Sequence, residues 1–279
     1  WLPCVGLVTQ GGCCRVIGEV SRASGLPVLA DADTGFGEGE MTARTVWEYA
    51  RAGAAGLHVE DQVFPKRCGH LDGKALVSIE HMQEKVHCAA KARDAHTAGH
   101  FVVGALTDAR GVDGMDAAIE RAKAYVDAGA DMIFPEGLAS ESEFEQVARA
   151  LKGYGSARGP YLLANMTEFG KTPQISVGRF AELGYSIVIF PVSSLRSAMG
   201  EVERLFASLK RDGHVGASLD RMQDRKRLYG LLGGRRAHWG RPPASGGASD
   251  AGRRRLTLRR GWRGSSPARR RSARSSRTL

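Results

Sequence analysis

Residues 27–37 read Pro-Val-Leu-Ala-Asp-Ala-Asp-Thr-Gly-Phe-Gly, a short apolar run that leads into two carboxylates and a glycine-containing loop. An apolar run of this length, bounded by glycine and polar residues, is typical of a buried β-strand. The stretch therefore predicts a strand over residues 27–30, with Asp31 and Asp33 directly after its carboxyl end.

The same arrangement recurs along the chain. Five further apolar runs predict strands, at residues 56–60, 101–105, 132–134, 161–164 and 187–190. Amphipathic patterns predict helices between and after them, at residues 41–51, 78–95, 116–128, 141–153, 177–183, 194–211 and 219–232. Strands that alternate with helices in this way indicate repeated βα units around a parallel sheet.

Two kinds of position fix the register of these units. Gly53 and Gly129 each stand between a helix and a strand, and we expect both to end their helices in the left-handed conformation. Polar side chains follow the strands at their carboxyl ends: Asp31, Asp33, Glu60, Asp61, Thr107, Asp108, Glu136 and Asn165. Polar groups at this end of successive parallel strands favour a barrel, and the GxGxxG opening of a Rossmann sheet is missing.

We therefore predict an α/β fold, a (β/α)8 TIM-type barrel, over residues 1–232. Six strands are two fewer than a closed barrel needs. The chain begins with Trp1 rather than Met, so we expect the barrel to be N-terminally incomplete, with the two further strands before this residue and residues 5–8 as a fragment of the second.

The last 47 residues differ sharply in composition from the rest. Residues 233–279 hold 14 Arg, no Lys and one acidic residue, Asp250, so their formal charge is +13. Because the whole chain has a formal net charge of +10, residues 1–232 carry −3. A basic nucleic-acid-binding domain is thereby excluded for residues 1–232, and we predict a disordered, low-complexity tail. This tail is either an arginine-rich arm that binds a polyanion or a solvated read-through segment, and we favour the second interpretation.

Composition excludes several other classes of protein. The chain is 42% hydrophobic and 25% charged, which is typical of a globular domain, and it has no apolar run long enough to span a membrane. Its five cysteines lack CxxC spacing and indicate neither a disulfide framework nor a zinc site: Cys4, Cys13, Cys14, Cys68 and Cys88. With no signal-peptide pattern at its start, the sequence predicts a cytoplasmic location.

Three carboxylates form a candidate metal site. Asp31 and Asp33 occupy alternate positions after the first strand, and Glu60 ends the next. Mg2+ binds through a few carboxylates together with waters and substrate oxygens, so these residues could hold it. The alternative is that the acidic loop residues only cap the following helix.

The segment Lys66-Arg67-Cys68-Gly69-His70 places a thiol between cations and an imidazole, in a loop directly after a strand. Positive neighbours lower the pKa of a thiol, so Cys68 is a candidate proton donor or nucleophile. A free cysteine is otherwise a small buried hydrophobe, as we expect for Cys88.

Six ordered motifs resemble the isocitrate lyase and phosphoenolpyruvate mutase superfamily, and within it the 2-methylisocitrate lyases. They are ADADTGFG (30–37), GLHVEDQVFPKRCGH (56–70), LTDA (106–109), DAAIERAKAYVDAGADMIFPEG (116–137), LANMTEFGKTP (163–173) and MQDRKRLY (222–229). The cysteine in KRCGH resembles the lyase branch. The resemblance implies that residues 1–232 form a partial barrel lyase domain.

The resemblance also implies roles for individual residues. Asp31, Asp33 and Glu60 would bind Mg2+, and Cys68 would protonate the departing carbanion, with Lys66 and His70 in the same catalytic loop. The substrate would contact Gly69, Glu136, Asn165, Met166, Thr167, Arg196 and Arg225. The implied reaction is cleavage of a small tricarboxylic acid, 2-methylisocitrate, to pyruvate and succinate, as in propionate catabolism through the methylcitrate cycle.

Taken singly, several of these residues have simpler interpretations. Glu136 could cap the next helix, Asn165 and Thr167 could serve a turn, and Arg196 could pair with an acid on its own helix.

The sequence departs from the family at several points. Leu106 replaces an arginine that grips a substrate carboxylate, and Cys4 stands where an aspartate is expected. The first family strand, with the base that removes the hydroxyl proton, would precede Trp1. The family forms homo-oligomers by exchanging a C-terminal helix, and the tail stands in its place here. We therefore keep three alternatives: an isocitrate lyase, a mutase or oxaloacetate-type decarboxylase, or an inactive remnant whose tail binds polyanions.

Overall fold

The computed structural model describes residues 6–232, and the chain divides into two units, residues 1–215 and 216–279. The strands of the first unit are β1 (Val28–Asp31), β2 (Ala54–Glu60), β3 (Val102–Thr107), β4 (Met132–Pro135), β5 (Tyr161–Asn165) and β6 (Ile187–Ile189). Its helices are α1 (Gln10–Ser24), α2 (Gly39–Ala52), α3 (Ile79–Thr97), α4 (Ala109–Val112), α5 (Met115–Asp127), α6 (Glu141–Leu151), α7 (Val177–Leu183) and α8 (Ser193–Asp212). The described part of the second unit holds the 3-10 helix η1 (Gly216–Arg221) and α9 (Arg225–Leu231).

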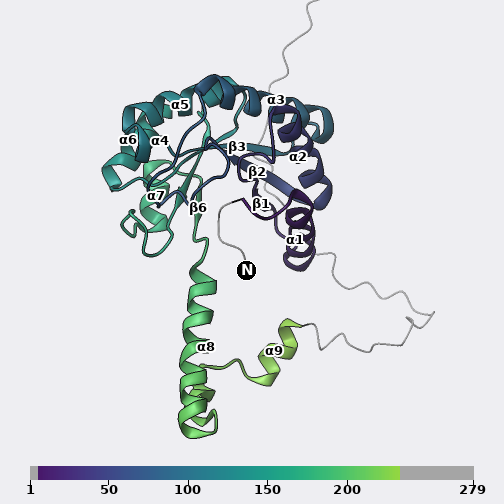
Figure 1. Ribbon diagram of the computed structural model, residues 1–279, viewed down its shortest axis with the longest axis vertical. Coiled ribbons are helices and arrows are strands. Elements are labelled where there is room, and N and C mark those ends of the chain that lie inside the picture. The colour runs from purple at the N-terminus through teal and green to yellow at the C-terminus, as the bar shows by residue number, and fades with distance from the viewer. Residues whose placement is uncertain (1–5, 233–279) are drawn as a thin grey trace, which may run out of the picture. The chain divides into compact units, whose positions relative to one another are not determined.

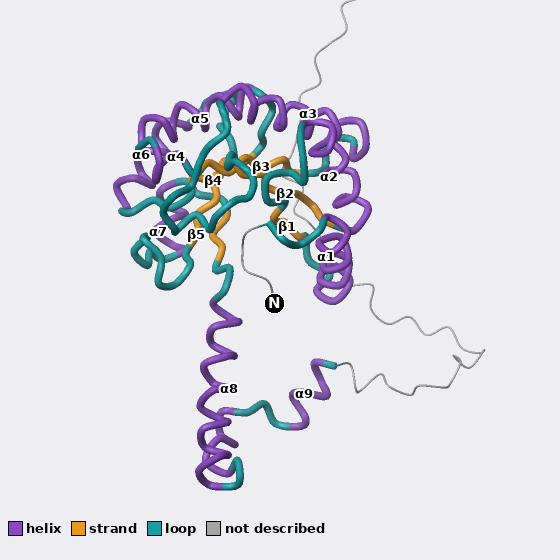
Figure 2. The backbone as a smooth tube through the Cα atoms, viewed as in Figure 1, coloured by secondary structure: helices purple, strands orange, loops and turns teal. Residues whose placement is uncertain are grey.

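The six strands form one parallel sheet in chain order. Ala30 of β1 lies opposite Leu57 of β2, which in turn lies opposite Val103 of β3. The sheet curls, and helices α2, α3, α5, α6 and α7 follow its outer side (Figure 1 and Figure 2). This α/β half-barrel confirms the predicted fold class for the described strands. Closure by two further strands remains a prediction.

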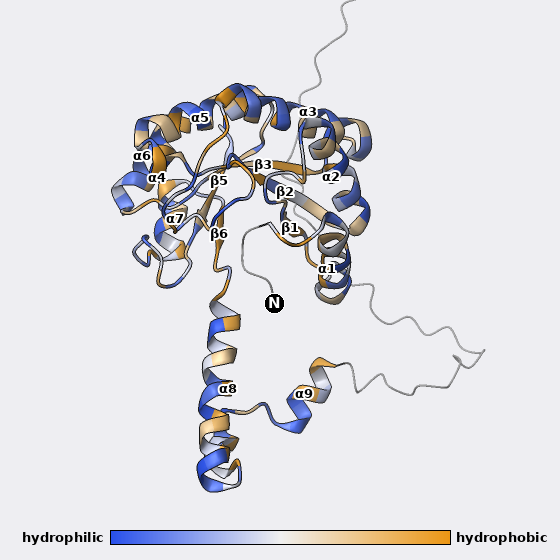
Figure 3. Ribbon diagram, in the orientation of Figure 1, coloured by the Kyte–Doolittle hydropathy of each residue, from blue (hydrophilic) through white to orange (hydrophobic). Residues whose placement is uncertain are grey.

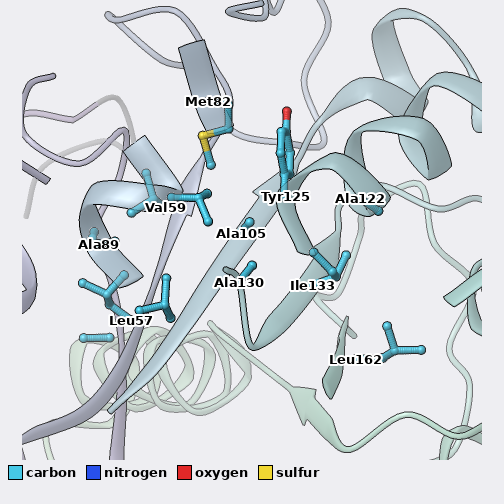
Figure 4. Packing of buried hydrophobic residues seen from close by; sticks show 14 of the residues in the cluster. Leu57, Val59, Met82, Ala89, Ala105, Ala122, Tyr125, Ala130, Ile133 and Leu162 are labelled. Atoms are coloured by element: carbon cyan, nitrogen blue, oxygen red, sulfur yellow. The ribbon is translucent and has the colours of Figure 1, made fainter. Parts of the chain in front are cut away.

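Side chains alternate between the two faces of each strand and so build two separate clusters. The outer cluster fills the space between sheet and helices, and it includes Leu57, Val59, Ala105, Ile133 and Tyr125 (Figure 4). The inner cluster consists of Leu106, Met132, Phe134 and Leu163. An apolar cluster on the concave face as well as the convex one is typical of a barrel-type sheet.

The helices are amphipathic, and Figure 3 shows apolar and polar residues alternating along them beside the more apolar strands. Gly53 and Gly129 have φ values of 106° and 109°, which confirms the predicted left-handed helix ends. None of the helices within residues 6–232 combines the length and the apolar character that a membrane crossing requires.

Helix α1 and the region after α8 differ from the prediction. The described residues 6–8 form a turn and loop rather than a strand, and α1 begins directly after them, with the Thr9 side chain accepting a hydrogen bond from Gly12 N at 3.2 Å. The sequence gives only a weak signal for α1, because Gly11 and Gly12 are weak helix formers. The single helix predicted over residues 219–232 is wrong: η1 and α9 take its place, and Asp224 caps α9 by accepting from Arg227 N. The predicted tail, residues 233–279, lies outside the described residues.

Candidate active site

A pocket of about 750 Å³ lies on the concave face of the sheet. Polar residues line it toward the carboxyl ends of the strands: Asp31, His58, Glu60, Lys66, Cys68, Gly69, His70, Asp108, Glu136, Asn165, Thr167 and Arg196. Deeper in, its walls are apolar and include Val28, Val102 and Ile187. Most of the residues predicted for the site from the sequence therefore meet in one cavity, although they come from segments more than 160 residues apart.

The pleat of the strands explains which side chains reach this pocket. His58 and Glu60 share the inner face of β2, whereas Leu57 and Val59 between them pack into the outer cluster. On and after β5 the same alternation turns Asn165 toward the pocket and Met166 into the core.

One lysine joins the predicted metal carboxylates. Lys66 Nζ lies 2.7 Å from Asp33 Oδ1 and 3.2 Å from Glu60 Oε2. Burial raises the pKa of Glu60 to about 8 even though Lys66 opposes the shift. Burial also opposes the charge on Lys66, but the nearby carboxylates outweigh it and raise the pKa of this ammonium group. The cluster holds a buried positive charge against two carboxylates at one end of the pocket.

Asp31 completes this end of the pocket. Its side chain lines the pocket, and its Oδ1 accepts a hydrogen bond from Asp33 N at 2.8 Å. Burial opposes its charge, yet the nearby His58 and Lys66, with the bond from Asp33 N, bring its pKa below the usual value. Asp31 therefore offers an ionised carboxylate to the cavity.

The donor set fits a hard divalent cation. Glu60 Oε1 is buried with no hydrogen-bond partner, and it belongs to a group whose other oxygen contacts Lys66. Within the described part of the chain, no three His, Cys, Asp or Glu side chains form a ready-made metal cage. Mg2+ does not need such a cage, because it retains waters and takes only one or two carboxylates together with substrate oxygens.

Cys68 lies in the segment between β2 and α3 and lines the pocket. Gly69 packs so closely there that an added Cβ would collide with the side chain of Glu136. His70 Nε2 lies 2.9 Å from Glu136 Oε1, and its Nδ1 accepts a hydrogen bond from Lys171 N. His70 therefore links the Cys68 segment to Glu136 and to the backbone of Lys171.

Glu136 and Asn165 link neighbouring strand ends. Asn165 Nδ2 donates to Glu136 Oε1 and Oε2 at 3.4 and 3.3 Å, and Asn165 Oδ1 accepts from Thr167 N at 2.9 Å. These bonds orient the amide and the carboxylate toward the cavity, which supports their predicted contact with a ligand.

Three other predicted substrate residues differ in their surroundings. Arg196, at the start of α8, lines the pocket, donates to the carbonyl of Glu168 and stacks 5.2 Å from the Phe169 ring. Met166 is fully buried in the outer cluster, so any contact with substrate would have to come from its main chain. Arg225 is the exposed first residue of α9 in the second unit, and its role remains a prediction.

Some residues around the pocket had no predicted role. His58 could have been found from its position two residues before Glu60, because strand side chains two apart share a face. The Leu106 side chain, noted as a departure from the family, joins Phe134 and Leu163 in the pocket wall. The buried Asp108 also contacts the Cys68 segment, because it pairs with Lys74 of that segment. This ion pair joins residues that are far apart in the sequence.

This architecture is a parallel half-barrel with a carboxylate cluster and a loop cysteine at the carboxyl ends of its strands, the arrangement that is typical of α/β-barrel enzymes. The family model for phosphoenolpyruvate phosphomutase matches residues 7–210. A probable 2-methylisocitrate lyase of Corynebacterium glutamicum is 52% identical over 231 residues, which are 83% of this chain and 73% of that protein. The chain therefore belongs to the phosphoenolpyruvate mutase and isocitrate lyase superfamily.

Solved structures agree with this relationship. A crystal structure of 2,3-dimethylmalate lyase has a TM-score of 0.74 and 38% identity, covering 83% of this chain and 74% of that one. A phosphonopyruvate hydrolase complex with oxalate and Mg++ has a TM-score of 0.70 and 28% identity, covering 83% and 77%. The close relatives are carbon–carbon lyases, which confirms the class of enzyme that the motifs indicate.

Proposed function

We propose that this chain cleaves 2-methylisocitrate to pyruvate and succinate, the carbon–carbon cleavage of the methylcitrate cycle in propionate catabolism. One observation carries the proposal: the Cys68 loop and the Asp31–Glu60 carboxylates line the same cavity. Names of close relatives support the substrate, since many of them are 2-methylisocitrate lyases.

The chain's own residues would protonate the carbanion and bind the charged groups of the substrate. A base takes the hydroxyl proton, the bond between the two carbon fragments breaks, and pyruvate forms with a carbanion on the other fragment. Cys68 gives its proton to that carbon, which yields succinate. Arg196 would bind a substrate carboxylate, and Glu136 with Asn165 would orient the substrate over the thiol.

We propose Mg2+ as the cofactor, held by Asp31 and Asp33 with Glu60 near its waters. When bound, Mg2+ supplies positive charge beside the oxygens that become negative during cleavage. Lys66 would keep the buried carboxylates close together until the cation enters, because it already contacts Asp33 and Glu60.

Product identification tests the proposal. The purified full-length chain is incubated with 2-methylisocitrate and Mg2+, and pyruvate and succinate are quantified by mass spectrometry. We expect both products in equal amounts, and we expect EDTA to stop their formation. No pyruvate, or glyoxylate formed faster from isocitrate than pyruvate from 2-methylisocitrate, would contradict the proposal.

A second candidate substrate is a dicarboxylate such as 2,3-dimethylmalate, the substrate named for one structural neighbour. Leu106 favours this alternative, because it presents an apolar side chain in the pocket wall beside Phe134. Cleavage would give pyruvate and propionate, so the same product analysis separates the two substrates.

We also propose a cytoplasmic location and self-association. The cysteine pattern supports the first. Helix α8 supports the second, since it exposes five apolar side chains spaced alternately by four and three residues: Leu195, Met199, Val202, Phe206 and Leu209. Light scattering of the purified chain measures the oligomeric state.

A further inference from the structure

We propose that Asp108, Gln62 and Lys74 form a clamp that positions Cys68, an inference that rests on the proposed role of this thiol. None of the three has a role in the mechanism above. The clamp consists of one carboxylate, that of Asp108, and two donors that hold the residues on either side of Cys68, Arg67 and Gly69.

The first arm of the clamp holds the residue before the thiol. Gln62 Nε2 donates to Asp108 Oδ2 at 2.6 Å and to the Arg67 carbonyl at 2.8 Å. Gln62 Oε1 accepts from Arg67 N at 2.9 Å. The amide of Gln62 thus bonds both the N–H and the carbonyl of Arg67 while its own NH2 group is fixed by a charged oxygen.

The second arm holds the residue after the thiol. Lys74 Nζ lies 2.8 Å from Asp108 Oδ1 and also donates to the Gly69 carbonyl. The side chain of Lys74 is 4% exposed and that of Asp108 is 1% exposed. A buried pair with further hydrogen bonds of this kind fixes geometry more strongly than a surface pair.

The carboxylate at the centre of the clamp is itself fixed. Asp108 N donates to Asp61 Oδ1 at 3.0 Å, and Asp61 Oδ2 accepts from Tyr125 OH at 2.7 Å. Asp61 is fully buried at the end of β2, and Tyr125 belongs to α5. The anchor of the Cys68 segment therefore reaches the core of the molecule and does not depend on the loop.

This arrangement matches what a proton donor to carbon requires. Cys68 stands between two residues, Arg67 and Gly69, that are both linked to Asp108, which would confine its thiol to one part of the cavity. A displacement of about 1 Å can cost on the order of a hundredfold in rate. Asp108, Gln62 and Lys74 act through Cys68 and are positioning residues.

Alkylation of Cys68 by iodoacetamide tests the clamp in the full-length chain. The labelling rates of the peptides that contain Cys68 and Cys88 are followed by mass spectrometry in Lys74→Met, Asp108→Asn and the double variant. We expect Cys68 to react at least tenfold faster in each single variant, with Cys88 within twofold of wild type. We expect Cys68 to react little faster in the double variant than in either single variant, because both changes open the same clamp.

The same variants are assayed for turnover. We expect kcat to fall at least tenfold while KM stays within threefold, since the thiol rather than the binding site loses its position. Glu143→Gln is the matched control, because Glu143 likewise pairs with a cation, Arg110, and accepts from a backbone amide, that of Ala139, without contacting the loop. In Glu143→Gln, the alkylation rate of Cys68 and the kcat should both match those of the wild type.

Several results would overturn the clamp. They are Cys68 labelling within twofold of wild type in both single variants, equal acceleration of Cys68 and Cys88, or acceleration in Glu143→Gln. Gln62→Ala carries the test if a single variant does not fold, and failure of all three to fold would contradict a local role. If wild type cleaves no substrate, the proposed function fails, while the labelling still decides the clamp.

Discussion

At the scale of single residues, the pocket gives its two ends different chemistry. The end that holds Asp31, Glu60 and Lys66 is built for charge, with carboxylates gathered around one buried ammonium group. The segment that holds Cys68 packs against the strand ends that carry Glu136 and Asp108. A substrate between them would meet a cation site on one side and a proton donor on the other.

Replacement of Cys68 by serine should therefore remove most of the activity. A hydroxyl is a much weaker acid than a thiol, and general acid catalysis contributes about 10²- to 10⁴-fold. We expect kcat to fall at least a hundredfold with an unchanged melting temperature, measured by pyruvate release and by circular dichroism. Cys88→Ser on α3 is the control, and equal losses in both variants would argue against a special role for Cys68.

Leu106 should govern the preference between substrates. Its side chain is 5% exposed and lies in the pocket wall, where an arginine could extend its apolar stem and pair with a carboxylate. A charge-assisted bond is worth about 1.5–3 kcal/mol, so Leu106→Arg should raise kcat/KM for 2-methylisocitrate roughly 10- to 100-fold relative to 2,3-dimethylmalate. Leu106→Met keeps the volume and should leave the ratio unchanged. An unaltered ratio in Leu106→Arg would show that this wall does not meet the distinguishing carboxylate.

At the scale of elements, the segment between β2 and α3 depends on a close approach at Gly69. A Cβ there would collide with the Glu136 side chain and lie 3.1 Å from Asp108 Oδ1. We expect Gly69→Ala to push the segment outward and to lower kcat at least tenfold. Gly11→Ala in α1, where no atom lies within 4 Å of the added Cβ, is the control, and steady-state kinetics of both variants makes the comparison. Full activity of Gly69→Ala would contradict the close packing.

The same elements show what the sequence can and cannot predict. The six strands could be predicted within a few residues, because apolar runs, helix-ending glycines and polar strand ends are local signals. Helix α1 could not, since Gly11 and Gly12 weaken its local signal and its packing on α2 outweighs them.

Residues of the site divide in the same way. Asp31, Glu60 and Cys68 stand out by their type and their position after a strand. The ion pair between Lys74 and Asp108 joins residues 34 apart. No local sequence pattern predicts which carboxylate a lysine will pair with after folding.

At the scale of the whole molecule, the charge is distributed very unevenly. Residues 233–279 carry +13 and residues 1–232 carry −3. We expect the full chain to bind a heparin column in a salt-dependent way, because clustered arginines bind polyanions. A variant that ends at residue 232 should pass through the same column unretained. Elution in a salt gradient measures both. Retention of the shortened chain would contradict this division of charge.

We propose that a cation held by Asp31 and Asp33 and the Cys68 thiol face one substrate from opposite sides of one pocket. Anomalous diffraction from crystals grown with Mn2+ and pyruvate tests this directly, because manganese replaces magnesium and can be located by its scattering. We expect the manganese peak within about 2–3 Å of an Asp31 or Asp33 carboxylate oxygen, with pyruvate between the metal and Cys68. A peak outside this carboxylate cluster, or a pyruvate molecule with no path to the thiol, would contradict the account.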